Sequence, residues 1–160
     1  MDITLLSAKY TVRRLDENDV GPIYELSRRN ELFYRYHPPF VTRESILDDL
    51  HALPPQKTLD DKYYVGFFAG ETLIAILDLI LAYPDEHTAL IGLFMMNADY
   101  QGRGIASHII ADVCRYLRQL GVQRVRIGVD KGNPQSFAFW SKNGFQVVGE
   151  KNYIHMERNL

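Results

Sequence analysis

Cysteine is almost absent from this chain, which has one, Cys114, among 160 residues. A single cysteine excludes an internal disulfide, and no cysteine pair or cluster offers a zinc site, so no metal is expected. Cys114 falls on the apolar-to-boundary side of a predicted helix. We therefore interpret it as a small buried hydrophobe rather than as a reactive thiol.

Long apolar runs are also missing. The longest extends from Leu73 to Tyr83 and is interrupted by Asp78, whereas a membrane-spanning helix needs about 20 apolar residues. The N-terminal stretch MDITLLSAKY has no basic region followed by an apolar core, so it does not read as a secretory signal. The expectation is a cytoplasmic protein without a membrane partner.

The chain also has no large excess of one charge. It contains 18 Lys and Arg and 20 Asp and Glu, for a net charge of −2. This balance gives no general attraction to nucleic acid, and no nucleic-acid partner is expected. Apolar residues make up 46% of the chain, an ordinary share for a globular protein. The length suits a single domain, residues 1–160, that can bury a core without covalent staples.

The first part of the chain predicts two helices and four strands. A strand over 10–15 precedes a helix that starts after Asp16–Asp19 and ends near Asn30, and Thr42 is the N-cap of a second helix. Strand patterns then follow at 62–69, 72–81 and 88–96, with Gly70-Glu71 as the first turn. Their connections are too short for crossover helices, so these strands should be antiparallel.

The second part changes to a helical period. Apolar residues recur at helical spacing from Ile105 to Leu120, and a strand over 122–129 follows Gly121. A strand–helix–strand unit normally makes a parallel pair. Another helix begins at Asn133-Pro134, and two final strands lie at 145–149 and 152–156. The predicted fold class is α+β: a mixed β-sheet, mainly antiparallel with a central parallel pair, flanked by about four helices.

The stretch YQGRGIAS, residues 100–107, has the composition of an anion-binding turn. The first N–H groups of a helix lack internal partners, and the helix dipole places about half a positive charge there. Gly102 and Gly104 carry no side chains that would hold an anion away from those amides, Ala106 is small, and Arg103 adds a cation. The alternative is a plain turn with a convenient glycine.

Two other phosphate-binding designs fit this stretch less well. A P-loop needs Lys-Ser/Thr after its second glycine, where this chain has Ile105-Ala106. A dinucleotide-binding turn is a closer rival, since GRGIAS reads G-x-G-x-x-S and Asp130 ends the next strand. However, residues 97–101 separate the strand from the glycines, and little chain remains for a doubly wound sheet.

A third design matches two segments in the right order. QGRGIA resembles the Q/R-x-x-G-x-G/A signature with which the GNAT superfamily of N-acetyltransferases grips the pyrophosphate of acetyl-coenzyme A. Asn133 followed by FWSKNGF, residues 139–145, resembles that family's N-x(5)-F-Y-x-K-x-G-F segment. The order of the predicted elements also fits, although the first 60 residues match only in pattern.

The resemblance implies acetyl-coenzyme A as the cosubstrate, held in a V between the fourth and fifth strands. It implies direct transfer of the acetyl group to a primary amine, expected to belong to a small molecule. The alternative is a non-catalytic acyl-coenzyme A sensor or interaction domain. The cofactor-binding residues that it implies, with only the main chain claimed for the two methionines, are Met95, Met96, Gln101, Gly102, Arg103, Gly104, Ile105, Ala106 and Asn133.

Two residues are candidates for catalysis. Asp78 is a carboxylate within the apolar run LIAILDLILAY, a costly position unless it is paired or functional. It is a candidate base or amine ligand, with a solvent-facing strand edge or a hydrogen-bond network as alternatives. Trp140 stands where the family often has a tyrosine acid, and an indole N–H is no useful acid. Trp140 either acts directly or packs, and Ser136, Ser141 or water are other proton donors.

The acceptor side is expected at the loop ELFYRYHPPF, residues 31–40, because the family's first two helices and their connection usually shape that side. Its aromatic residues form a lid over the acceptor or pack onto the sheet, and the sequence leaves both open. Arg35 could hold an acidic acceptor, and His87 could relay a proton, but both read more simply as exposed side chains. Dimers are common among proteins of this kind, so a homodimer is one expected state.

Overall fold

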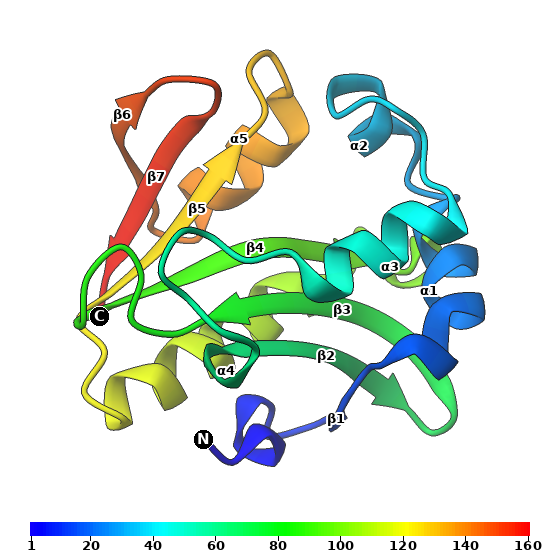
Figure 1. The fold of residues 1–160 in the computed structure, drawn as a ribbon, viewed down its shortest axis with the longest axis horizontal. Helices are drawn as coiled ribbons and strands as arrows, with labels where there is room; N and C mark the ends of the chain where they lie inside the picture. The colour runs from blue at the N-terminus through cyan, green and yellow to red at the C-terminus, as the bar shows by residue number, and fades with distance from the viewer.

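Seven strands form one sheet in the order β1-β2-β3-β4-β5-β7-β6. The computed structural model describes all residues, 1–160 (Figure 1). The strands are β1 (Thr11–Arg14), β2 (Lys62–Ala69), β3 (Thr72–Ile80), β4 (Thr88–Met96), β5 (Arg124–Val129), β6 (Gln146–Glu150) and β7 (Ile154–Asn159). Only β4 and β5 are parallel, and every other neighbouring pair is antiparallel. The predicted mixed sheet with one parallel pair is therefore confirmed.

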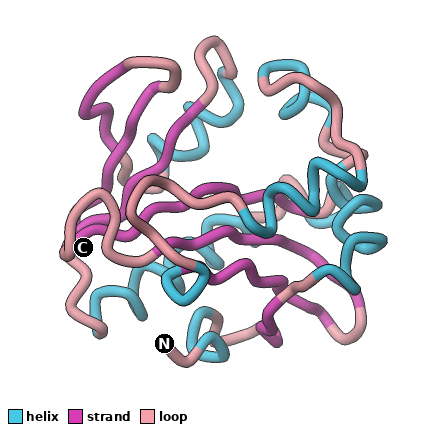
Figure 2. The backbone as a smooth tube through the Cα atoms, viewed as in Figure 1, coloured by secondary structure: helices cyan, strands magenta, loops and turns pink.

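Helices cover both faces of the sheet (Figure 2). They are α1 (Val20–Ser27), α2 (Glu31–Tyr36), α3 (Arg43–His51), α4 (Ile105–Gln119) and α5 (Pro134–Lys142), with 3₁₀ turns at η1 (Ile3–Leu6), η2 (Glu17–Asp19), η3 (Leu59–Asp61) and η4 (Ala98–Tyr100). The additional helix is α2, which lies in the stretch predicted to be a loop. Glu31 in its first turn and Arg35 in its last turn complement the helix dipole.

Two hydrophobic cores lie on opposite faces. The first packs α4 and α5 against the sheet, with Ile110, Val113 and Leu117 fully buried. The second packs α1 and α3 against the other face, through residues such as Ile23 and Ile46. Burial of each such side chain contributes about 1.5–3 kcal/mol. Cys114 belongs to the first core and its burial raises the pKa of the thiol, as expected for a buried hydrophobe.

Several element bounds differ from the prediction by a residue or two, and the difference is largest for the first helix and the last strand. The first helix ends at Ser27 rather than near Asn30, because the Asn30 side-chain amide donates to the Leu26 carbonyl and ends the helix there. The last strand was predicted over 152–156. In the structure it is β7 over Ile154–Asn159, because these residues pair with the full length of β5. No helix in this structure has both the length and the apolar character needed to cross a membrane.

The parallel pair separates after four residues of each strand. β4 pairs with β5 only over Thr88–Ile91, and β5 then continues alongside β7. The register between β3 and β4 also shifts there, so that Gly92 is an extra residue, a β-bulge. Figure 1 shows the two strands diverging beyond this point. The second half of β4, from Gly92 to Met96, is left without a strand on that side.

Candidate functional site

The open edge of β4 presents main-chain groups from alternate residues. The N–H of Asn97 donates to the carbonyl of Ile74 at 2.8 Å, which makes these two residues a hydrogen-bonded pair. Alternation along the antiparallel ladder then directs the main chain of Met95 toward β3. Phe94 and Met96 point their N–H and C=O groups to the open side. The main chain of Met95, a predicted contact of the cofactor, therefore faces β3, and the main chain of Phe94 faces the open side instead.

The loop after β4 leaves a row of N–H groups without partners in the protein. Those of Gly102, Arg103 and Gly104 make no hydrogen bond. The N–H groups of Ile105, Ala106 and Ser107 belong to the first turn of α4, where no internal acceptor exists. Gln101 is different, since its N–H donates to the Ala98 carbonyl at 3.3 Å. The available row is therefore residues 102–107.

Glycine is required in this loop for its backbone conformation. Gly102 and Gly104 have φ values of 74° and 76°, in the left-handed region. A Cβ at Gly102 would meet no atom within 4 Å, and at Gly104 it would meet only the His108 ring nitrogen at 4.0 Å. Open space therefore lies beside both glycines, and the left-handed backbone is the reason that glycine is needed at these positions.

Side-chain bonds fix the loop in place. The Gln101 side-chain amide donates to Asn30 Oδ1 at 2.9 Å and to the Met96 carbonyl at 3.2 Å. Arg29 makes two hydrogen bonds to Asp99, at 2.8 and 3.1 Å. The end of α1 is thereby tied to the loop, so the amide row is held in position before any ligand arrives.

One cleft of about 810 Å³ contains both the amide row and the open edge of β4. All the predicted site residues line it except Arg103 and Asp78. Arg103 is exposed, with its guanidinium 5.8 Å from the centre of the Tyr100 ring. Phe94, Phe139 and Ser136 also line the cleft, and Phe94 is the residue that the sequence reasoning missed. The volume lies within the usual range of about 300–1,000 Å³ for small-molecule sites.

Asn133 caps α5 at the wall of this cleft. Its side-chain oxygen accepts a hydrogen bond from the Ser136 N–H at 3.1 Å, and only 4% of the residue is exposed. Pro134 follows at the first helical position, as predicted. The first role of this asparagine is therefore to position the start of α5.

Trp140 is buried in an aromatic cluster, with 4% of its surface exposed. Its ring centre lies 5.0 Å from Phe139, 4.9 Å from Phe145 and 6.1 Å from Phe94, each in an edge-to-face arrangement. Such contacts are favourable beyond the area that they bury. This geometry supports packing as the role of Trp140. The aromatic cluster also lines the cleft beside the open edge of β4.

Asp78 lies in a buried ion pair behind the β4 bulge. Its Oδ2 is 2.7 Å from the Lys62 ammonium nitrogen, and its Oδ1 is buried without a partner. Burial raises the pKa of the Asp78 carboxyl, while Lys62 partly opposes that rise. A Cβ at Gly92 would lie 2.7 Å from Oδ2, so the carboxylate reaches the exposed main chain at the point where β4 and β5 part. The structural alternatives for Asp78 were a solvent-facing strand edge and a hydrogen-bond network, and the structure shows the second, an internal ion pair with Lys62.

Other ionisable groups gather on the same face of the sheet. Asp49 of α3 is exposed to water, yet the surrounding protein raises the pKa of its carboxyl. Burial raises the pKa of Tyr34 to about 12 and that of Tyr64 well above its usual value. His87 is exposed and lies just before β4 begins, at the end where β4 still pairs with β5.

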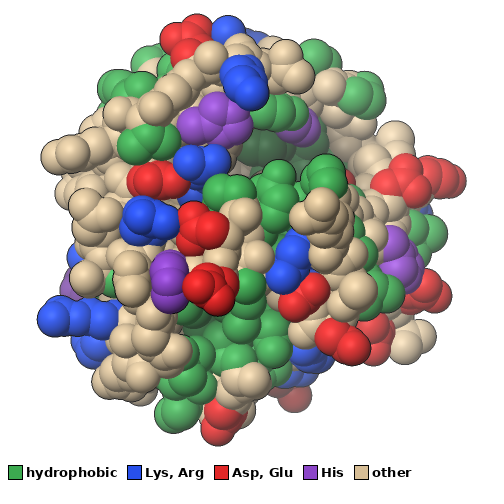
Figure 3. Space-filling model, turned by 60° about the vertical axis from the view of Figure 1, so that its left-hand side comes forward, with side chains coloured by type: hydrophobic (Ala, Val, Ile, Leu, Met, Phe, Trp, Pro, Cys, Tyr) green, Lys and Arg blue, Asp and Glu red, His purple; other side chains and the backbone are tan.

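Helix α2 reaches across the V. His37 at its C-terminal end contacts Asp130 Oδ1 at 3.0 Å, and Asp130 follows the last residue of β5. Phe33 and Tyr34 of α2 pack against the core under α1 and α3. The predicted loop therefore both packs and spans the opening. Figure 3 shows a deep hollow near the top of the view, lined by hydrophobic side chains and rimmed by charged ones.

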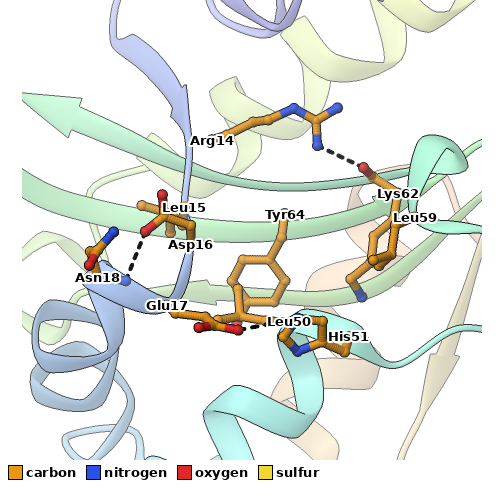
Figure 4. A pocket seen from close by; sticks show the side chains of 10 residues that line it. All are labelled: Arg14, Leu15, Asp16, Glu17, Asn18, Leu50, His51, Leu59, Lys62 and Tyr64. Carbon is orange, nitrogen blue, oxygen red and sulfur yellow. Dashed lines mark hydrogen bonds and ion pairs between the residues drawn. The ribbon is translucent and has the colours of Figure 1, made fainter.

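A second cavity, of about 540 Å³, lies between β1, β2 and α3 (Figure 4). It contains none of the predicted site residues. Its lining residues are Arg14, Leu15, Asp16, Glu17, Asn18, Leu50, His51, Leu59, Lys62 and Tyr64. Lys62 connects it to Asp78, and so to the β4 bulge.

Comparison with known proteins identifies relatives across most of the chain. The model of the acetyltransferase (GNAT) family matches residues 23–145. A spermidine N(1)-acetyltransferase of Thermoplasma acidophilum is 28% identical over 148 residues, which cover 85% of this chain and 88% of that protein.

Two solved structures share the fold. An acetyltransferase from Thermus thermophilus has a TM-score of 0.81 at 22% identity, covering 95% of this chain and 97% of the other. The PaiA N-acetyltransferase from Thermoplasma acidophilum, in complex with coenzyme A, has a TM-score of 0.72 at 21% identity, covering 94% and 99%. The matched family segment contains the amide row, the open edge of β4 and all of α5, and the chain belongs to the acetyltransferase (GNAT) family.

Proposed function

We propose that this protein transfers an acetyl group from acetyl-coenzyme A to a primary amine of a small molecule. The observation that carries the proposal is the row of unpartnered N–H groups at residues 102–107, beside the open edge of β4 in one cleft. Such a row at a helix start binds phosphate groups, and an open strand edge binds an extended chain that carries amides. A coenzyme A molecule has both parts.

In this proposal the donor substrate lies with its diphosphate on residues 102–107 and its pantetheine arm along Phe94 and Met96. The Met96 carbonyl already accepts from Asn30 and Gln101, which leaves its N–H and both groups of Phe94 for the ligand. In this proposal the Phe94 N–H would stabilise the negative charge that develops on the acetyl carbonyl oxygen during attack.

The proposed base is Asp78. The acceptor arrives as an ammonium ion and must lose a proton before its nitrogen can attack. Asp78 would take that proton, giving a neutral amine and a carboxylic acid. A carboxyl whose pKa is raised by burial is better matched to this task near neutral pH than an ordinary aspartate. The coenzyme A thiol has a pKa of about 8.5, so it can leave as the thiolate without an acid at the position of Trp140.

The proposed acceptor is a cationic amine. Asp49 and Asp78 stand on the same face of the sheet near the bulge, and Asp130 lies across the V from α2. The carboxylates of Asp49 and Asp78, which act on each other across this face, favour a substrate with positive charge. The relative named as a spermidine acetyltransferase is consistent with a polyamine acceptor. A cytoplasmic location and a homodimeric state remain predictions.

Release of free thiol from acetyl-coenzyme A tests the proposal. The purified protein is incubated with acetyl-coenzyme A and a panel of amines that includes spermidine, short diamines and amino acids. We expect thiol release that depends on a cationic amine, with an acetylated product detected by mass spectrometry. Tight coenzyme A binding without release across the panel would favour a sensor. Thermal stabilisation by NAD but not by coenzyme A would favour a dinucleotide-binding protein.

A further inference from the structure

The Lys62 ammonium group is buried at the start of β2, with 2% of its side chain exposed. Its nitrogen donates to Asp78 Oδ2 at 2.7 Å and to the Ala52 carbonyl at 2.9 Å. Figure 4 shows Lys62 among the side chains that line the second cavity. The lysine therefore stands between this cavity and the carboxylate behind the β4 bulge.

Stability alone explains this pair poorly. A buried ion pair is often no more stabilising than apolar side chains of similar volume, because both charges lose their hydration. Here the cost is not fully offset, since Asp78 Oδ1 has no partner. The pair also holds the carboxylate where a side chain at position 92 would collide with it. Gly92 is exposed, so the arrangement keeps Asp78 within reach of a molecule at the bulge.

We propose that Lys62 is a positioning residue for acetyl transfer, which holds Asp78 ionised and fixes its carboxylate beside Gly92. This inference rests on the proposed function, in which Asp78 takes the proton of the acceptor. Lys62 does not touch the substrate, and it acts only through Asp78.

The charged and titratable groups around Asp78 determine whether removal of the Lys62 charge raises or lowers the pKa of Asp78. Lys62 and Tyr64 face it from β2, and Asp49 acts on it from α3. Lys62 lowers the pKa of Asp78, whereas burial and Asp49 raise it. Removal of the ammonium therefore raises the pKa, so that ionised Asp78 is reached only at higher pH.

The test compares Lys62→Met with Lys57→Met. Lys57 also forms an ion pair with an aspartate, Asp61, at 3.2 Å, but that pair does not include Asp78. We expect Lys62→Met to shift the acidic limb of the kcat/KM profile to higher pH and to lower kcat near neutral pH by about tenfold or more. KM for acetyl-coenzyme A should be unchanged. Lys57→Met should have the same pH profile, kcat and KM as wild type.

Carbon-13 NMR of the Asp78 carboxyl tests the inference without an activity. The signal is assigned by its loss in Asp78→Asn, and it should titrate at higher pH in Lys62→Met than in wild type. Lys62→Gln, which keeps an N–H donor but not the charge, is the second variant if Lys62→Met does not fold. Unmoved titration in a folded variant would overturn the inference, whether or not the protein is an enzyme. No turnover with any amine would instead contradict the proposed function.

Discussion

Replacing Gly104 with glutamate tests the amide row at the start of α4. The new side chain would stand among the N–H groups of residues 102–107, where the diphosphate is proposed to bind. A Cβ there meets only the His108 ring nitrogen, at 4.0 Å, so no collision with the protein is expected. The φ of 76° disfavours any non-glycine residue, at a cost of about 1–2 kcal/mol in the free energy of unfolding.

The loss of binding should come from charge. A carboxylate about 5 Å from a phosphate charge is repelled by about 3 kcal/mol at an effective dielectric constant near 20, which corresponds to about a hundredfold in Kd. Gly104→Gln is the matched control, because it carries the same strain and nearly the same volume without the charge. Calorimetric titration with coenzyme A, with thermal melting to verify the fold, gives both Kd values. Equal Kd values for folded Gln and Glu variants would refute the reasoning.

Three further predictions concern stability and packing. Asn133→Ala should lower the free energy of unfolding by about 1 kcal/mol in urea titrations, because α5 loses its N-cap, whereas Asn133→Ser should retain most of it. The Arg13 guanidinium lowers the pKa of Asp19 below 3.8, so the stability of this pair is present above that value and lost as the pH falls through the folded pKa. Asp19→Asn should therefore flatten the decrease in stability on acidification, as measured by urea midpoints at successive pH values. Trp140→Phe should keep kcat within several-fold while lowering stability by about 1–3 kcal/mol, and loss of all turnover in a folded variant would show a direct role for the indole.

Most of the fold was predictable from residues that are close together in the sequence. The bounds of β2 and β4 were predicted to the residue, because each is a short apolar run next to turn residues, Gly70-Glu71 after β2 and the loop with Pro84 and Asp85 before β4. The amide row was also predictable, since the glycines directly precede the helix start in the sequence, although Gln101 lies outside the row. Helix α2 was missed because its short aromatic sequence buries no residue completely, so no apolar stripe marks it.

Non-local geometry explains what the sequence could not provide. The choice of Phe94 over Met95 depends on which residues of β4 bond to β3, and a register is a property of two strands. The partner of Asp78 is 16 positions away, and it becomes visible only once β2 and β3 are paired. Gly92 gave no signal of its own, because an isolated glycine in a strand marks a bulge only when the neighbouring strand is known.

A crystal structure with coenzyme A bound tests the central claim most directly. The account predicts that the diphosphate oxygens lie within hydrogen-bonding distance of N–H groups from residues 102–107, and that the pantetheine amides bond to the main chain of Phe94 and Met96. Coenzyme A bound elsewhere, with these N–H groups still unpartnered, would contradict it.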